Sequence, residues 1–268
     1  MEASHNWSTD GTPVESDNTG LLSAGLLRRE MRLSPRVQEV VLENGVHAVE
    51  FSGPRIHNEM AAYLVSDEFG FELIPPTELV GEEEDQVARR LFVRSNLDTP
   101  GFDYMNKQTR EQILKVDLFD YITARRDRQG YGRFSENHMV INGTVLPSDF
   151  EMAFDRPEPD TFNRRHSLGQ VLPLPVLANI NRFAKDPERI ARFREKLEAS
   201  GISARSAQAA IDRAIKVGQV CSPSNRFQGL SIQDIAAGRL QKHIFTLGML
   251  NELKDFAESQ IDTYFRLH

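Results

Sequence analysis

The chain has 268 residues, 40% of them hydrophobic and 26% charged, and its formal net charge is −7. A chain of this length and composition can bury a sizeable core, and nothing in it indicates a fibrous or wholly disordered protein. The negative charge argues against a partner that is mainly nucleic acid, so none is expected. The single cysteine, Cys221, excludes an internal disulfide, and we expect a reducing, cytoplasmic compartment.

The N-terminal segment is predicted to be a tail. Its first 20 residues are mostly polar and include Gly and Pro, without the apolar core of a signal peptide. No apolar run in the chain is long enough for a membrane span. The short apolar segment from Gly20 to Leu27 can cover the domain's own surface, with a docking arm or a membrane-touching turn as alternatives. We therefore predict a disordered or loosely docked tail over residues 1–32 and one domain over 33–268.

The first folded elements are predicted from an Asn-Gly pair, a strong hairpin signal because both central residues of the tight turn need positive φ. Asn44-Gly45 joins strands expected at Gln38–Leu42 and Val46–Phe51. After Pro54, apolar residues recur at helical spacing until Gly70, which is placed to end the helix. A hairpin followed by a helix is therefore expected.

Two more strands are predicted at Thr77–Val80 and Val87–Val93. Hairpin, helix and hairpin together form a small antiparallel sheet lobe, which we assign to residues 33–95. Residues 96–268 are predicted to form a mainly helical lobe. It begins with a helix at about Thr109–Arg125 and contains a second Asn-Gly hairpin, at Asn142-Gly143.

Helix signals dominate after Pro173. Asp186-Pro187 combines a capping side chain with a proline suited to the first helical position, so a helix is expected to begin there. Gly201 is placed to end that helix, and Ser203 is placed to cap the next one.

Two carboxylates flank the second predicted hairpin. Asp127 lies in a loop after a helix, and Asp149 follows the hairpin in Asp149-Phe150-Glu151. Phosphoryl transfer needs a carboxylate that orients the acceptor hydroxyl and ligands that hold Mg²⁺ on nucleotide phosphates. Two carboxylates separated by a hairpin can converge on one ion. Either alone also fits a turn residue or a helix cap.

This arrangement resembles the catalytic region of atypical kinases. The similar segments are Leu118–Ile122, Asp127-Arg128, the hairpin, and Asp149 leading to Ala153-Phe154. The group includes phosphoinositide 3- and 4-kinase-like enzymes, HipA-type bacterial kinases and secretory-pathway casein kinases. Upstream, Asn58–Tyr63 and Ile74–Thr77 resemble the group's helix and following strand. The resemblance implies an α+β, two-lobed protein-kinase-like fold that uses ATP and Mg²⁺.

The resemblance also implies roles for individual residues. Asp127 would be the catalytic base or hydroxyl-orienting group, and Asp149 a Mg²⁺ ligand. Glu59 would be the helix carboxylate that faces the nucleotide site. Asn137 is our candidate for the second metal ligand, because its separation from Asp149 suits a short hairpin.

The chain departs from the pattern of this group at several positions. Gln129 replaces the usual His, and no clear Gly-rich phosphate loop is present. The first Lys in the chain is Lys107, so the sheet lobe has no Lys for the nucleotide phosphates. Arg55 or Arg36 can substitute, since guanidinium binds phosphate well. The alternative for Arg55 is a local pair with Glu59, four residues further along the helix.

Three functions are compatible with these patterns. The first is ATP-dependent transfer of phosphate, or of a nucleotide-derived group, to a protein or small-molecule hydroxyl. The second is a pseudokinase that acts as a nucleotide-binding or scaffolding module, which the missing Lys favours. The third is an unrelated α/β binding protein, since the motifs are short.

Overall fold

The computed structural model describes residues 5–7, 13–15, 22–82, 85–92, 107–125, 138–141, 144–154 and 174–220. Its central feature is a five-stranded antiparallel sheet with the strand order β3-β4-β5-β7-β6. The strands are β3 (Leu26–Ser34), β4 (Val37–Leu42), β5 (His47–Phe51), β6 (Thr77–Val80) and β7 (Val87–Leu91). Gly45 has a φ of 82°, as the predicted turn between β4 and β5 requires.

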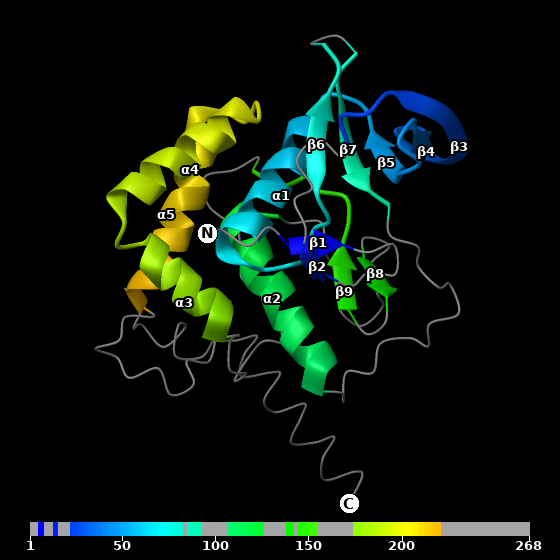
Figure 1. Ribbon diagram of the computed structural model, residues 1–268. Helices are drawn as coiled ribbons and strands as arrows, with labels where there is room; N and C mark the ends of the chain where they lie inside the picture. Colours follow the sequence, from blue (N-terminus) through cyan, green and yellow to red (C-terminus); the bar gives the residue numbers. More distant parts are fainter. Residues whose placement is uncertain are drawn as a thin grey trace, which may run out of the picture.

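Helix α1 (Ile56–Phe69) joins the sheet to the helical part of the molecule. It contacts β6 and β7 on one side and helices α2, α3 and α4 on the other, and Figure 1 shows it between the sheet and α4. The helix ends at Gly70, whose φ of 66° lets the backbone turn away. The N–H of Phe71 then donates to the carbonyl of Ser66 at 2.9 Å, which closes the helix end.

The remaining described elements are mostly helices. They are α2 (Lys107–Thr123), α3 (Leu174–Phe183), α4 (Pro187–Ala199) and α5 (Ala204–Val220), with two small hairpins, β1 (His5–Trp7) with β2 (Pro13–Glu15), and β8 (His138–Ile141) with β9 (Thr144–Pro147). Asp186 caps α4 as predicted, because its carboxylate accepts a hydrogen bond from the N–H of Arg189 at 2.9 Å. A small antiparallel sheet followed by helices confirms the predicted α+β class.

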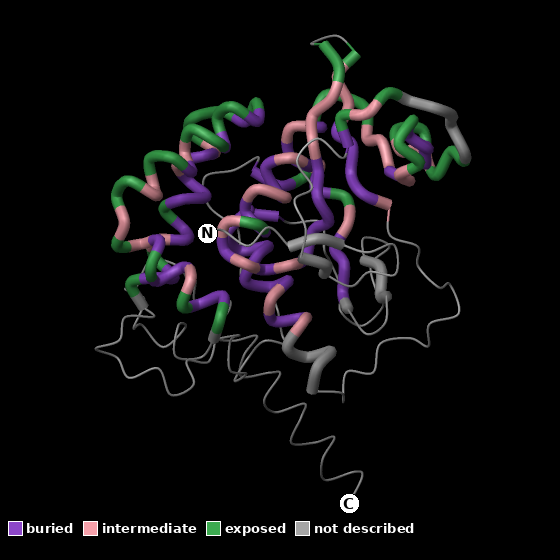
Figure 2. The backbone as a smooth tube through the Cα atoms, viewed as in Figure 1, coloured by how far each residue is buried: buried purple, intermediate pink, exposed green. Residues whose placement is uncertain are grey.

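The larger hydrophobic core lies between α1, α2 and the helices α3–α5. Figure 2 shows buried backbone gathered at this centre. Six phenylalanine rings in it make edge-to-face contacts: Phe69, Phe71, Phe119, Phe150, Phe183 and Phe193. Because Phe150 belongs to this network, the segment just after Asp149 is fixed to the core.

A smaller core lies against the sheet and includes Leu22, which is fully buried beside Val40, Leu42 and Leu91. The Leu22 segment is held by Arg89, whose Nη1 donates to the carbonyls of Leu22 and Ala24 at 2.7 and 2.8 Å. Leu22 and most of strand β3 lie within residues 1–32, the range assigned to the tail from sequence. In the structure this part of the range packs on the sheet lobe and contributes its edge strand.

No helix in the described part of the chain is both long enough and apolar enough to cross a membrane.

Candidate nucleotide site

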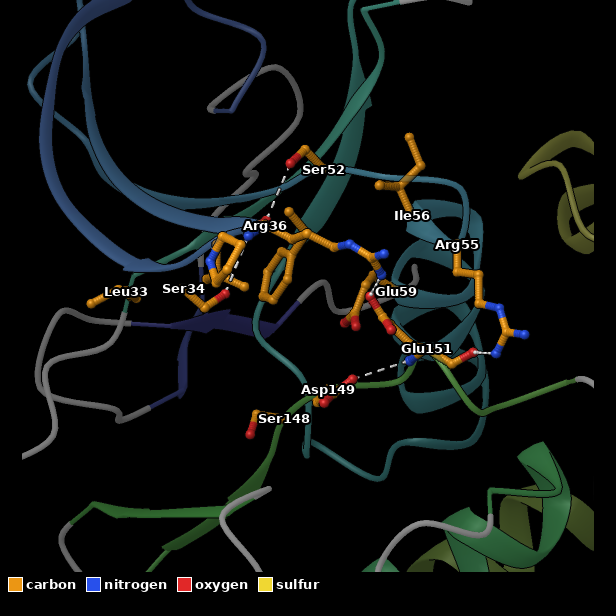
Figure 3. A pocket seen from close by; sticks show the side chains of 13 residues that line it. Leu33, Ser34, Arg36, Ser52, Arg55, Ile56, Glu59, Ser148, Asp149 and Glu151 are labelled. Atoms are coloured by element: carbon orange, nitrogen blue, oxygen red, sulfur yellow. Dashed lines mark hydrogen bonds and ion pairs between the residues drawn. The ribbon is translucent and has the colours of Figure 1, made fainter.

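A cavity of about 490 Å³ opens beside the turn between β3 and β4 (Figure 3). Its other walls are the end of β5, the first turn of α1 and the segment that follows β9. Its apolar lining comes from Leu33, Pro35, Val37, Phe51 and Ile56, and its charged lining from Arg36, Arg55, Glu59, Asp149 and Glu151. The four residues assigned to ligand or metal binding from sequence are Arg55, Glu59, Asp149 and Asn137, and the first three line this cavity.

Glu59 is the most enclosed charged group of the cavity, with only 2% of its surface exposed. One carboxylate oxygen, Oε2, accepts a hydrogen bond from Nη2 of Arg90 at 2.7 Å. The other, Oε1, accepts from the backbone N–H of Phe150, also at 2.7 Å. The carboxylate therefore connects strand β7 with the residue that follows Asp149.

Arg90 is the cation that sequence reasoning missed. It lies directly opposite Val49 in the β5–β7 register. Its Nε donates to Thr77 Oγ1 at 3.0 Å, and its guanidinium lies 4.9 Å from the ring centre of Phe51. Burial lowers the pKa of Arg90, while the charge of Glu59 opposes that shift.

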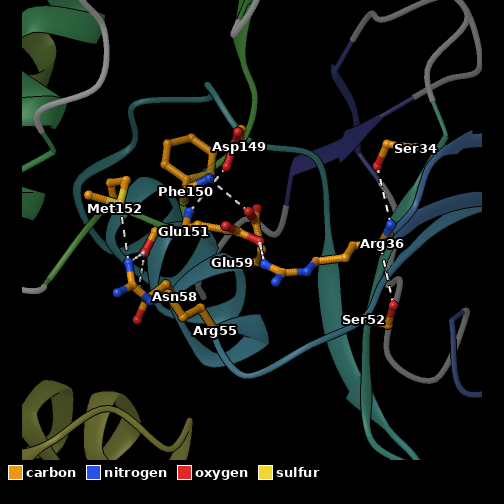
Figure 4. A network of polar contacts seen from close by, with 10 residues as sticks. All are labelled: Ser34, Arg36, Ser52, Arg55, Asn58, Glu59, Asp149, Phe150, Glu151 and Met152. Carbon is orange, nitrogen blue, oxygen red and sulfur yellow. Dashed lines mark hydrogen bonds and ion pairs between the residues drawn. The ribbon is translucent and has the colours of Figure 1, made fainter.

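Arg55 and Asn58 hold the segment that follows Asp149 against α1. Nη1 of Arg55 donates to the carbonyl of Glu151 at 3.0 Å. Nδ2 of Asn58 donates to the carbonyls of Glu151 and Ala153, both at 2.9 Å. The first turn of α1 thus fixes the backbone on which Asp149 is carried, as Figure 4 shows.

Asp149 itself is exposed and lines the cavity. Its backbone has a φ of 59°, which is uncommon for a residue other than Gly and is tolerated best by Asn and Asp. At this turn two neighbouring side chains point in different directions: Phe150 enters the core, and Asp149 faces the cavity. The arrangement presents a carboxylate on an anchored backbone.

Asp127 and Asn137 lie outside the described residues, as does the Asn142-Gly143 turn. The described residues that precede Asp127 end at Arg125. The guanidinium of Arg125 lies 4.7 Å from the ring centre of Phe150. The N–H of Phe154 donates to the carbonyl of Thr123 at 2.8 Å. The end of α2 and the segment after Asp149 are therefore in direct contact.

Arg36 reaches into the cavity from the β3–β4 turn. Its Nη1 donates to Oε1 of Glu151 at 2.9 Å, and both side chains are well exposed, at 54% and 40%. Its backbone carbonyl accepts from the N–H of Ser52 at 2.9 Å. The cavity thus has one cation on the turn and another, Arg55, at the N-cap of α1.

Comparison with known proteins supports the fold and leaves the family open. No protein-family model matches the chain, and no curated protein matches it in sequence. Among solved structures, Golgi casein kinase with Mn/ADP bound has a TM-score of 0.51 at 12% identity, over 76% of each chain. A second crystal structure of Golgi casein kinase has a TM-score of 0.50 at 12% identity, over 75% of this chain and 72% of that one. The Helicobacter pylori proinflammatory kinase CtkA has a TM-score of 0.40 at 8% identity, over 72% of this chain and 91% of that one.

The first two matches define the class of structure. The chain has an atypical kinase-like fold, with a small antiparallel sheet and a helical part arranged as in Golgi casein kinase. The resemblance predicted from sequence is confirmed at the level of the fold.

Proposed function

We propose that the chain binds ATP together with Mg²⁺ in the cavity beside the β3–β4 turn and transfers phosphate to a hydroxyl of a protein or small molecule. One observation carries this proposal. The carboxylate of Glu59 joins Arg90 to the N–H of Phe150 and so holds Asp149 at the cavity. A fixed carboxylate beside a cation-lined cavity is the arrangement that phosphoryl transfer needs.

The cavity suits a nucleotide in size and in lining. Its volume of about 490 Å³ lies in the range of small-molecule sites. Apolar side chains such as Phe51 and Ile56 suit a nucleobase, and Arg36 and Arg55 suit phosphate. In this proposal Arg55 and Glu59 belong to the nucleotide site, although Glu59 acts through Arg90 and Phe150 rather than on the phosphates.

The donor set fits Mg²⁺ only in the presence of nucleotide. Within the described ranges, no group of three or more His, Cys, Asp or Glu side chains could hold a metal. Mg²⁺ is commonly held by one or two carboxylates together with substrate phosphates, so a single exposed Asp149 suffices for the protein's share. When bound, the ion would neutralise charge on the phosphates. We propose Asn137 as its second protein ligand and Asp127 as the group that orients or deprotonates the acceptor hydroxyl.

The second candidate is a pseudokinase, a nucleotide-binding or scaffolding module. It is favoured by the absence of Lys before Lys107 and by the enclosure of Arg90, which pairs with Glu59 instead of facing the cavity. A chain of this kind would bind nucleotide in the same cavity without transferring phosphate.

A transfer assay with labelled ATP separates the two candidates. Asp149→Asn removes the charge and keeps a residue that tolerates positive φ, so the fold should be preserved. We expect Asp149→Asn and Asp127→Asn each to lower transfer, including autophosphorylation, by about 100-fold or more. The matched control is Asp212→Asn, on the exposed face of α5, which should transfer at the wild-type rate.

The outcomes assign the function. Transfer that survives in Asp149→Asn would reject the proposed metal site. A wild-type chain that binds ADP with Mg²⁺ but transfers no phosphate to any acceptor tested, itself included, would favour the pseudokinase. A chain without either property would reject both candidates.

A further inference from the structure

The β3–β4 turn is hydrogen-bonded to the residue that follows β5, and Arg36 makes these hydrogen bonds. The carbonyl of Arg36 accepts from the N–H of Ser52 at 2.9 Å and from its hydroxyl at 3.4 Å. The N–H of Arg36 donates to the hydroxyl of Ser34 at 3.3 Å. Arg32 adds a hydrogen bond from its Nη2 to the carbonyl of Pro35 at 3.0 Å. The backbone of this turn is therefore held although the turn is exposed.

The side chain of Arg36 is directed into the cavity over Gly53. A Cβ atom at Gly53 would lie 3.4 Å from Cδ of Arg36, and Gly53 has a φ of 115°. The positive φ favours glycine at this position, where the arginine stem passes close to the backbone. Figure 3 shows the guanidinium extending toward Glu59 and Glu151.

Glu151 meets Arg36 from a backbone that is equally well held. Its carbonyl accepts from Arg55 and Asn58, and its N–H donates to Oδ1 of Asp149 at 3.4 Å. Only the side chain of Glu151 is free to move without disturbing these contacts. Because the Arg36–Glu151 pair is well exposed, it contributes little to stability.

From this geometry we infer that Arg36 is the phosphate-binding cation of the cavity, and that Glu151 occupies it until a phosphate displaces the carboxylate. The inference rests on the proposed function and names the residue that takes over from the missing Lys. A guanidinium can form two parallel hydrogen bonds with phosphate oxygens, whereas it forms one with Glu151 here. The ligand class is a nucleoside diphosphate or triphosphate, bound through its phosphates.

The inference predicts opposite effects at the two ends of one ion pair. Arg36→Ala removes the cation and should weaken binding of ADP about 10-fold or more, since hydrogen bonds to charged groups are among the stronger ones. Glu151→Gln removes the competing carboxylate and should tighten binding of ADP by about two- to fivefold. A purely structural ion pair would give no gain from Glu151→Gln.

The test is calorimetric titration of the full chain with ADP, with tripolyphosphate and with adenosine, each with and without Mg²⁺. The affinity for tripolyphosphate should fall in Arg36→Ala and rise in Glu151→Gln, as for ADP. The affinity for adenosine should be unchanged by both substitutions. The matched controls are Arg192→Ala and Glu188→Gln, an exposed ion pair on α4. Arg36→Lys keeps the charge but lacks the guanidinium geometry for two parallel hydrogen bonds. Its affinity for ADP should lie between those of wild type and Arg36→Ala.

The outcomes of this test distinguish the inference from the function on which it rests. If wild type binds ADP while Arg36→Ala and Glu151→Gln bind it equally well, the inference is overturned and the proposed nucleotide site stands. If wild type binds neither ADP nor tripolyphosphate, the proposed function fails and the inference fails with it.

Discussion

Two pairs of arginines occupy opposite settings in the sheet lobe. Arg89 and Arg90 lie next to each other on β7, are almost fully buried, and each meets a carboxylate oxygen at 2.7 Å, on Glu50 and Glu59 respectively. Arg36 and Arg55 lie at the cavity and are exposed. The buried arginines thus form ion pairs inside the fold, whereas the exposed arginines line the cavity.

The difference in burial indicates which arginines of this Lys-free sheet lobe stabilise the fold and which can contact a ligand. A buried guanidinium that loses its partner is left as an uncompensated charge. The Arg90–Glu59 pair must therefore stay intact for the fold to remain stable. An exposed guanidinium exchanges one anion for another at little cost, so Arg36 can exchange Glu151 for a ligand, and Arg55 lies exposed at the same cavity. Stability should therefore depend on the β7 pair, and ligand affinity on the cavity pair.

The largest effect is expected for Arg90→Ala. The substitution leaves Glu59 buried without its cation, and such a loss typically costs about 3–5 kcal/mol of unfolding free energy. Urea denaturation of the variant and wild type measures it. Replacing both partners with apolar residues, as in Arg90→Met with Glu59→Leu, should restore part of the loss.

A loss below about 1 kcal/mol in Arg90→Ala would contradict the proposed division of roles, because surface substitutions already reach about half that value. The control is Arg192→Ala on α4, whose side chain is 62% exposed.

A smaller effect on stability is expected for Arg55→Ala. Its hydrogen bond to the carbonyl of Glu151 lies at the surface, so unfolding free energy should fall by about 1 kcal/mol or less. ADP binding with Mg²⁺ should nevertheless weaken several-fold, because the variant loses a cavity cation and loosens the segment that carries Asp149. Denaturation and calorimetry on the same sample compare the two quantities. Unchanged ADP affinity would remove Arg55 from the nucleotide site.

Local sequence signals predicted most of the described elements closely. The β4–β5 hairpin and the end of α1 follow from single residues, Gly45 and Gly70, whose backbone needs positive φ. Strand β3 was missed because Arg28-Arg29-Glu30 interrupts any apolar alternation. Charge is common on edge strands, where it discourages pairing with other chains, and β3 lies at an edge of the sheet.

The site was predicted only in part, for a physical reason. Asp149 is recognisable from its position after a hairpin, and Glu59 from the resemblance of the helix that carries it to the helix of atypical kinases. The partner of Glu59 is not, since Arg90 is 31 residues away and reaches it only because α1 packs against β7. A pair of adjacent arginines inside a strand, at Arg89-Arg90, was the available signal that buried cations stand there.

The central claim is that this cavity binds a nucleotide together with a divalent metal ion held by Asp149. Its most direct test is calorimetric titration of the wild-type chain and Asp149→Asn with ADP, with and without Mg²⁺. The account predicts that Mg²⁺ tightens binding of ADP to wild type, and that Asp149→Asn binds ADP equally with or without the ion. Binding that is absent from wild type, or a Mg²⁺ effect that survives intact in Asp149→Asn, would contradict it.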